Sequence, residues 1–114
     1  MRKLFLFFIL VLSSAVSQAG GGYVCVSGYL YFPNGDQTYV GQSDCENATI
    51  KGSFACVSGF LHKPDGNKDY VGNSDCQKAR IGNGYACVGG YLYKPDVSKT
   101  YVGSSACETG NFGD

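Results

Sequence analysis

The chain has 114 residues, of which nine are Lys or Arg and nine are Asp or Glu, so its formal net charge is zero. This balance disfavours nucleic-acid binding, which needs clustered cations against the phosphate backbone. Six cysteines and 17 glycines in so short a chain indicate a small disulfide-rich protein rather than one built on a large core.

The segment from Met1 to Ala19 has the layout of a secretory signal peptide. Arg2 and Lys3 precede the apolar run 4–12, and small residues lead up to Ala19. The apolar run is too short to span a bilayer. We therefore expect cleavage after Ala19 and a secreted, extracellular protein with no membrane association. Removing two cations leaves seven basic and nine acidic residues, a net charge of −2.

The rest of the chain contains three copies of one pattern with a period of about 31 residues, and each copy has two cysteines at a constant spacing. The copies divide the chain into repeats at 20–53, 54–84 and 85–114. Units this short cannot bury enough apolar surface alone, so we expect them to pack as one compact domain. A linear stack and a closed threefold body both fit the period, and the short spacers favour the closed body.

Each copy reads as a β-hairpin around a proline turn. Pro33-Asn34-Gly35 combines a fixed φ with residues that tolerate positive φ, and Val97 in the third copy predicts a wider loop. A symmetric hairpin in the first copy pairs residues whose numbers sum to 70, and a bulged three-residue loop changes that sum by two without exchanging the faces. One predicted face then carries the cysteine and the tyrosines, and the other, the predicted core, carries Val26, Leu30 and Val40.

A short helix is predicted after each hairpin. Ser43-Asp44-Cys45-Glu46 fits the capping box, in which Ser at the N-cap and Glu or Gln three residues later satisfy two helical amides. Ala48 and Ile50 are expected to dock this helix on the hairpin. The predicted fold class is therefore a small, disulfide-rich, mainly β protein of three tandem repeats, each a β-hairpin plus a short helical turn.

The cysteines are predicted to form disulfides, because the secretory route is oxidising and the close pairs typical of zinc sites are missing. Hairpin pairing favours one bridge within each copy, and each bridge contributes roughly 3 kcal/mol in the chain-entropy model. Bridges between neighbouring copies, Cys45 to Cys56 and Cys76 to Cys87, stay open as an alternative. The six residues are Cys25, Cys45, Cys56, Cys76, Cys87 and Cys107.

The sequence offers little for catalysis, and we expect a protein that is not an enzyme and that needs no cofactor or metal. His62 is the only histidine, and tyrosines occupy the equivalent positions of the other two copies, so it reads as a member of an aromatic row. The aspartates do not have EF-hand spacing, and turn and helix-end chemistry account for most of them.

The aromatic face is the sharpest candidate site. Tyrosine combines a stiff apolar ring with a polar tip, which suits stacking on sugars or contact with a protein, although packing between copies is the alternative. The candidate ligand-binding residues are Tyr29, Tyr31, Tyr39, Phe60, His62, Tyr70, Tyr91, Tyr93 and Tyr101.

Two shorter motifs complete the survey. Asn47-Ala48-Thr49 is an N-glycosylation sequon, which marks Asn47 as a candidate glycan acceptor. The segment from Asp65 to Tyr70, followed by Ser74, Cys76 and Ala79, is similar to a stretch of Kazal-type protease inhibitors. Its spacings differ by single residues and it lacks their six-cysteine framework, so the resemblance assigns no reactive-site residue.

These observations lead to one principal function and two alternatives. The principal hypothesis is a secreted, non-catalytic binding or extracellular-matrix protein that presents three equivalent Tyr-rich patches to a glycan or an extracellular structural polymer. One alternative is a soluble effector, such as a protease inhibitor or defence protein, that acts through its exposed turns. The other is a structural coat component whose tyrosines become cross-linked.

Overall fold

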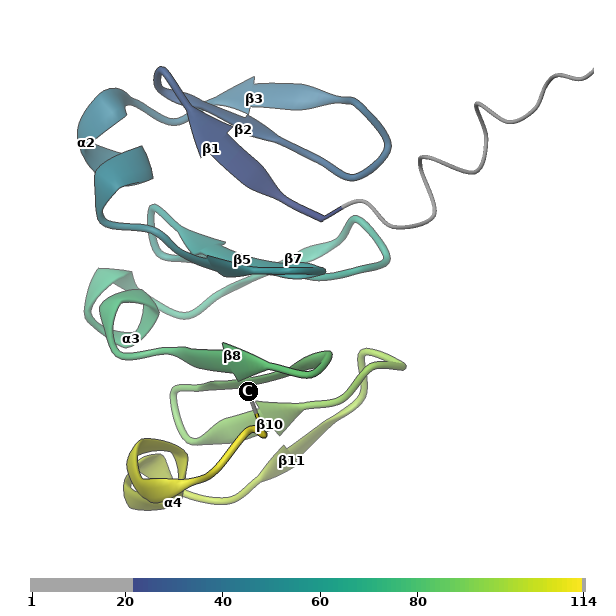
Figure 1. Ribbon diagram of the computed structural model, residues 1–114. Helices are drawn as coiled ribbons and strands as arrows, with labels where there is room; N and C mark the ends of the chain where they lie inside the picture. Colours follow the sequence, from purple (N-terminus) through teal and green to yellow (C-terminus); the bar gives the residue numbers. More distant parts are fainter. Residues whose placement is uncertain (1–21, 114) are drawn as a thin grey trace, which may run out of the picture.

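A computed structural model describes residues 22–113 of the chain, so the predicted leader Met1–Ala19 lies outside the described residues. The described part is small and mainly β, with antiparallel sheets of three or four strands, three disulfides and short helices. Figure 1 shows the sheets stacked one above another in a line, and not closed into the threefold body that the short spacers favoured.

The first sheet has the order β1-β2-β3, with β1 at Val24–Val26, β2 at Tyr29–Tyr31 and β3 at Gln37–Tyr39. Helix α2, Gln42–Glu46, follows it. The second sheet has the order β4-β5-β6-β7, and its strands are β4 Thr49–Lys51, β5 Phe54–Val57, β6 Phe60–His62 and β7 Lys68–Tyr70.

Helix α3, Asn73–Gln77, leads from the second sheet to the third. The third sheet has the order β8-β9-β10-β11, with strands β8 Arg80–Gly82, β9 Tyr85–Val88, β10 Tyr91–Tyr93 and β11 Lys99–Tyr101, and helix α4, Ser104–Thr109, ends the series.

Strands β4 and β8 were not predicted, and they change how the copies connect. The segment with Ile50, expected to dock α2 on its own hairpin, instead crosses to the next sheet as β4 and pairs with β5. Likewise β8 leaves α3 and pairs with β9. Consecutive sheets are therefore joined by shared chain segments, and the sheet boundaries do not coincide with the boundaries of the sequence copies.

A second tight turn in each sheet also went unpredicted. Ser27 and Gly28 have φ of 54° and 84°, which suits the two-residue turns of β-hairpins, and they fold β1 onto β2. Val26 consequently lies opposite Tyr29 and shares its face, and Cys25 lies opposite Leu30. The prediction that Val26 belongs to the core face was wrong, because the turn exchanges the two faces for every residue before it.

The proline turn sets the second hairpin. Phe32 N–H donates to the Asp36 carbonyl at 2.8 Å and Gly35 N–H donates to the Phe32 carbonyl at 2.9 Å, so three residues form the loop. Tyr29 therefore pairs with Tyr39 at a sum of 68 rather than 70. Since the shift is by two positions, the tyrosines stay together on one face and Leu30 lies on the other, fully buried.

The helices begin earlier than the capping-box prediction. Gly41, with φ of 104°, is the N-cap of α2 and no side chain caps this helix, so Ser43 lies inside it. Val40 and Gly41 N–H groups both donate to the Gly28 carbonyl, at 2.8 and 2.9 Å. This pair of bonds turns the chain sharply into the helix at a conformation that favours glycine, so the serine is not needed as a cap.

Two buried clusters hold the stack together, one in each gap between sheets. Tyr23, Leu30, Ala55 and Val57 pack between the first and second sheets. The larger cluster, between the second and third sheets, contains the buried residues Phe54, Cys56, Leu61, Cys76, Ala79, Ala86, Val88 and Tyr93.

The disulfides join Cys25 to Cys45, Cys56 to Cys76 and Cys87 to Cys107, as the predicted bridges within copies require. The bridged residues are not cross-strand neighbours, however. Each bridge ties the first strand of a hairpin to the helix that follows, as from β1 to α2. The pairing was predicted correctly from an incorrect hairpin geometry.

The third proline turn is not wider than the others. Lys94 N–H donates to the Ser98 carbonyl and Val97 N–H to the Lys94 carbonyl, both at 2.8 Å, as in the other copies. Val97 accordingly adopts a φ of 66°, which a β-branched residue disfavours.

Replacing Val97 with glycine should raise the free energy of unfolding by about 1 kcal/mol, because glycine adopts this φ without strain. Urea unfolding would measure the change. Gly66 is the matched control, since it holds the same place in the second copy at φ 87° with no atom near its missing Cβ. Gly66→Val should lower stability by a similar amount, and a loss of stability in Val97→Gly would contradict the argument.

Candidate functional site

The three most exposed aromatic side chains, Tyr39, Tyr70 and Tyr101, each belong to a cross-strand aromatic pair, one in each sheet. Strand pairing places Tyr29 opposite Tyr39, Phe60 opposite Tyr70 and Tyr91 opposite Tyr101. The ring centroids are 5.2, 5.3 and 5.2 Å apart, at interplanar angles of 72°, 71° and 72°. These are edge-to-face contacts of nearly identical geometry. We call these three contacts the aromatic pairs.

The second tyrosine of each pair remains open to solvent. Tyr39, Tyr70 and Tyr101 are 68%, 72% and 67% exposed. Each ring lies against a glycine of the tight turn, and a Cβ on Gly28 would come within 3.0 Å of the Tyr39 ring at φ +84°. Glycine at this position thus permits both the turn and the close approach of the ring.

Cations lie over two of the pairs. Lys68 Nζ is 4.6 Å from the centroid of the Phe60 ring, and Lys99 Nζ is 4.9 Å from that of Tyr91. Both distances fall in the range of cation–π contacts. The first sheet has Gln37 at the corresponding position, so its pair lacks the positive charge.

The third candidate aromatic residue of each copy differs between sheets. Tyr31 is partly exposed on the first sheet, whereas His62 and Tyr93 are buried. His62 lies beneath the first sheet, with ring centroids 5.8 Å from Tyr23 and 5.4 Å from Phe32. Of the nine predicted ligand-binding residues, the burial of His62 and Tyr93 leaves the aromatic pairs and Tyr31 available for stacking.

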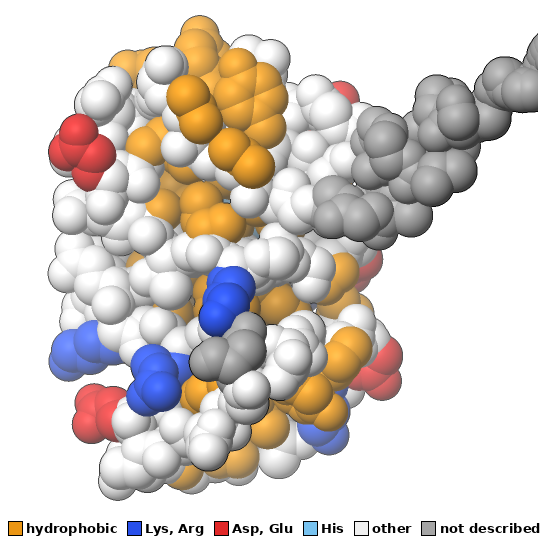
Figure 2. All heavy atoms as spheres, in the orientation of Figure 1, with side chains coloured by type: hydrophobic (Ala, Val, Ile, Leu, Met, Phe, Trp, Pro, Cys, Tyr) orange, Lys and Arg blue, Asp and Glu red, His pale blue; other side chains and the backbone are white. Residues whose placement is uncertain are grey.

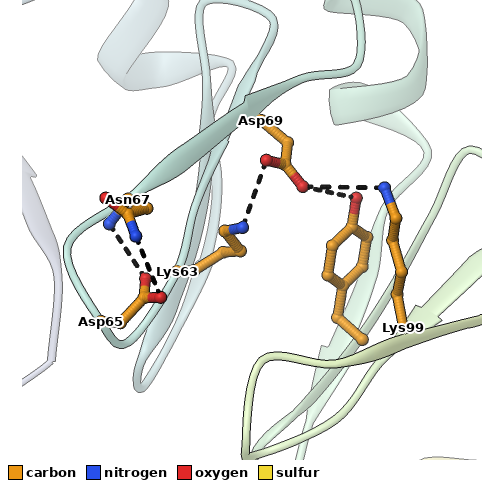
Figure 3. Close-up of polar contacts among 6 residues, drawn as sticks. Lys63, Asp65, Asn67, Asp69 and Lys99 are labelled. Atoms are coloured by element: carbon orange, nitrogen blue, oxygen red, sulfur yellow. Dashed lines mark hydrogen bonds and ion pairs between the residues drawn. The ribbon is translucent and has the colours of Figure 1, made fainter.

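Tyr93 bridges the second and third sheets through a polar cluster (Figure 3). Its hydroxyl donates to Asp69 Oδ2 at 3.1 Å, and Lys63 Nζ contacts Asp69 Oδ1 at 3.2 Å. Burial acts to raise the pKa of the Asp69 carboxyl, but these hydrogen bonds and nearby Lys99 together hold it below its usual value. Burial, with Asp69 nearby, raises the pKa of Tyr93 to about 12. The hydroxyl therefore stays protonated as a donor.

A groove of about 630 Å³ opens beside His62, between the proline turns of the first and second copies. Burial and the cation of Lys68, which lies opposite on β7, lower the pKa of His62 to about 4, so the imidazole is neutral at physiological pH. Its Nδ1 is buried without a hydrogen-bond partner in the described structure. The groove is lined by Phe32, Thr38, His62, Lys63, Gly66, Asn67, Lys68 and Asp69.

The sequence signals for Tyr23 and Asp69 were missed. Tyr23 is buried, and its hydroxyl donates to the Lys63 carbonyl at 2.7 Å, which ties the first copy to the second. Its equivalence to Phe54 in the next copy was the available signal, because Phe54 reads as part of an apolar strand. Asp69 stands where the other copies have threonine. This difference was the available signal that the position makes a polar contact in the second copy alone.

Asn47, the candidate glycan acceptor, is the C-cap of α2 and is exposed. The sequon hydroxyl on Thr49 donates to the Cys76 carbonyl at 2.9 Å in the folded chain. Within residues 22–113, no three His, Cys, Asp or Glu side chains form a group that could hold a metal ion. None of the helices described is long and apolar enough to cross a membrane.

No protein-family model matches the sequence, and comparisons with curated proteins and with solved structures find no match.

Proposed function

We propose that this chain is a secreted, non-catalytic binding or extracellular-matrix protein that presents its three aromatic pairs to a carbohydrate or structural polymer. The observation that carries the proposal is the repetition of one exposed geometry: three edge-to-face pairs, each with an outer tyrosine that is at least 67% exposed. An exposed ring with a polar tip suits stacking on a pyranose face.

Secretion is supported by the leader pattern of Met1 to Ala19 and by the three disulfides, which persist in oxidising compartments. The proposal treats the three sequence copies as equivalent structural units. Equivalent weak sites on one stiff body reinforce one another on a repetitive target, because the second and third contacts are intramolecular.

Binding to chitin, cellulose and mixed glycans tests the proposal. Changing Tyr39, Tyr70 and Tyr101 to alanine should weaken binding by about 3- to 10-fold per ring, as expected for the loss of one aromatic contact. The matched variant carries phenylalanine at the same three positions, which keeps the rings and should retain most of the affinity. Thermal unfolding of both variants checks that the fold is intact.

Undiminished binding by the alanine variant would refute the aromatic pairs as the site. A protease inhibitor or another effector that acts through its turns would also keep its activity in that variant, because the proline turns are unchanged. The experiment thus separates the two classes of function.

A further inference from the structure

The face of the first sheet that points away from the stack is apolar, and no other part of residues 22–113 covers it. Val24, Val26, Tyr29 and Tyr31 share it, and we call these four residues the upper face. Figure 2 shows hydrophobic side chains gathered at the top of the molecule, over β1–β3.

Most of the corresponding face of the other two sheets is covered by the sheet above, although Tyr91, the equivalent of Tyr29, stays 38% exposed. Val26 is 52% exposed, whereas its equivalents in the second and third copies, Val57 and Val88, are 1% exposed. Tyr31 is partly exposed, whereas His62 and Tyr93 are buried. The upper face is therefore half of an interface that the chain forms twice internally.

The other half of that interface lies at the opposite end of the stack, where no further sheet of the described chain covers it. In the internal interfaces, the lower side of a sheet contributes Tyr23, Leu30 and Val40, or Phe54, Leu61 and Val71. The third sheet has Tyr85, Leu92 and Val102 at these positions, and Tyr85 and Val102 are exposed. We call Tyr85, Leu92 and Val102 the lower face.

The segment after α4 is placed like a linking strand. Strands β4 and β8 each follow a helix and become the edge strand of the next sheet, and β4 contacts β8. Asn111–Gly113 is the equivalent of β8 in the third copy. It lies beside β8, just as β8 lies beside β4. Arg80 Nη1 donates to the Glu108 carbonyl at 2.7 Å, and Asn83 Nδ2 donates to the Phe112 carbonyl at 2.8 Å.

The first sheet has the matching gap. Among residues 22–113, β1 pairs only with β2, whereas β5 and β9 also pair with β4 and β8. At one end of the described chain, the β1 edge has no linking strand beside it. At the other end, Asn111–Gly113 has no further sheet to join.

We propose that copies of this chain associate end to end, with the lower face of one copy on the upper face of the next. Residues Asn111–Gly113 would extend the first sheet of the next copy along β1. Within one chain, Ile50 of β4 pairs with Ala55 of β5. Phe112 is the equivalent of Ile50, and Val24 is the equivalent of Ala55. Phe112 of one chain would therefore lie opposite Val24 of the next. Such a head-to-tail contact leaves one face free at each end, so it builds open filaments.

Two features bear on the strength and the consequence of this contact. Asp44 accepts a hydrogen bond from Ser58 between the first two copies, but Ala106 stands at the Asp44 position in the third, so the contact between chains lacks this bond. The interface between the second and third copies also lacks it, because Gly89 stands at the Ser58 position, so the contact between chains resembles that interface in this respect. Tyr70 and Tyr101 stay exposed although their sheets are covered, so association would leave the outer tyrosines free.

Sedimentation velocity of the secreted chain over a wide concentration range tests the proposal. The weight-average mass should rise continuously as the concentration increases, with species that differ in mass by one chain. Val26→Glu on the upper face and Tyr85→Glu on the lower face should each weaken association by at least about tenfold, because each places a charge in an apolar contact. Lys78→Glu, on the side of the stack, is the control and should leave association unchanged.

Mixing the two variants separates this geometry from others. Each retains one intact face, so the mixture should form heterodimers and stop there. Hydrogen exchange of the β1 amides in the unmodified chain should slow with concentration, and this measurement does not depend on a variant that folds.

A chain that stays monomeric at all concentrations would overturn the proposal, as would association lost in Val26→Glu but unchanged in Tyr85→Glu, which indicates pairing of two upper faces. Monomeric behaviour with protected β1 amides would also overturn the proposal, because it would show that another segment of the same chain covers this edge. Glycan binding measured below the association range is independent, so the two proposals can fail separately.

Discussion

Replacing Leu61 with alanine should lower the free energy of unfolding by about 3 kcal/mol, as is typical when a fully buried leucine is truncated. Leu61 has no exposed surface and packs between the second and third sheets with Phe54 and Val88. The loss combines the transfer free energy of the missing methyl groups with the cost of a cavity, which the surroundings fill only partly because Cys56–Cys76 holds β5 to α3 beside it.

Leu92 is the matched control for Leu61. It occupies the same position in the third copy, but it lies on the lower face and is only half-buried. Leu92→Ala should cost about 1 kcal/mol, because less apolar surface is returned to water. Urea unfolding of both variants measures the difference. Equal losses at dilute concentration would show that the third sheet is not the end of the stack.

Acid should destabilise the chain through His62. The pKa of His62 is about 4 in the folded chain, because burial and Lys68 disfavour the imidazolium, and about 6.5 in an unfolded chain. The unfolded state therefore binds more protons between these two values. The stability that this histidine contributes is complete above about pH 6.5 and is lost as the pH falls toward 4, by up to about 3 kcal/mol.

His62→Tyr isolates this contribution, because Tyr31 and Tyr93 occupy the equivalent positions of the other copies. Urea unfolding from neutral pH down to about pH 4.5 should show a steep loss of stability in the unmodified chain and a shallow one in the variant. Asp69 does not interfere in this window, since its pKa lies below the usual carboxyl value and its effect is lost only at lower pH. Parallel curves for the two chains would exclude His62 as the source.

Local chemistry predicted the parts of the site that depend on neighbours along one hairpin. The alternation of side chains placed the tyrosines together and Leu30 on the other face, and this survived a two-position error in register. It failed for Val26, because Ser27-Gly28 adopts positive φ in a tight turn and serine gives little signal for that conformation.

The fate of the third aromatic position could not be predicted from its own copy. Tyr31 and Tyr93 each end a Tyr-Leu-Tyr strand, yet one is partly exposed and the other is buried. The difference is the sheet above: Tyr93 lies under the second sheet, whereas no described residue covers Tyr31.

By itself, then, the sequence determined the disulfide partners, the positions of the proline turns and the placement of the hairpin tyrosines on one face with Leu30 on the other, because these follow from spacings and side-chain types within one copy. The tertiary structure decided that the sheets stack in a line, that β4 and β8 cross to the next sheet, and that His62 and Tyr93 are buried. Those outcomes depend on which surfaces meet across the gaps between sheets. The three copies repeat one pattern, so the sequence of a single copy does not indicate which of its surfaces the next copy will cover.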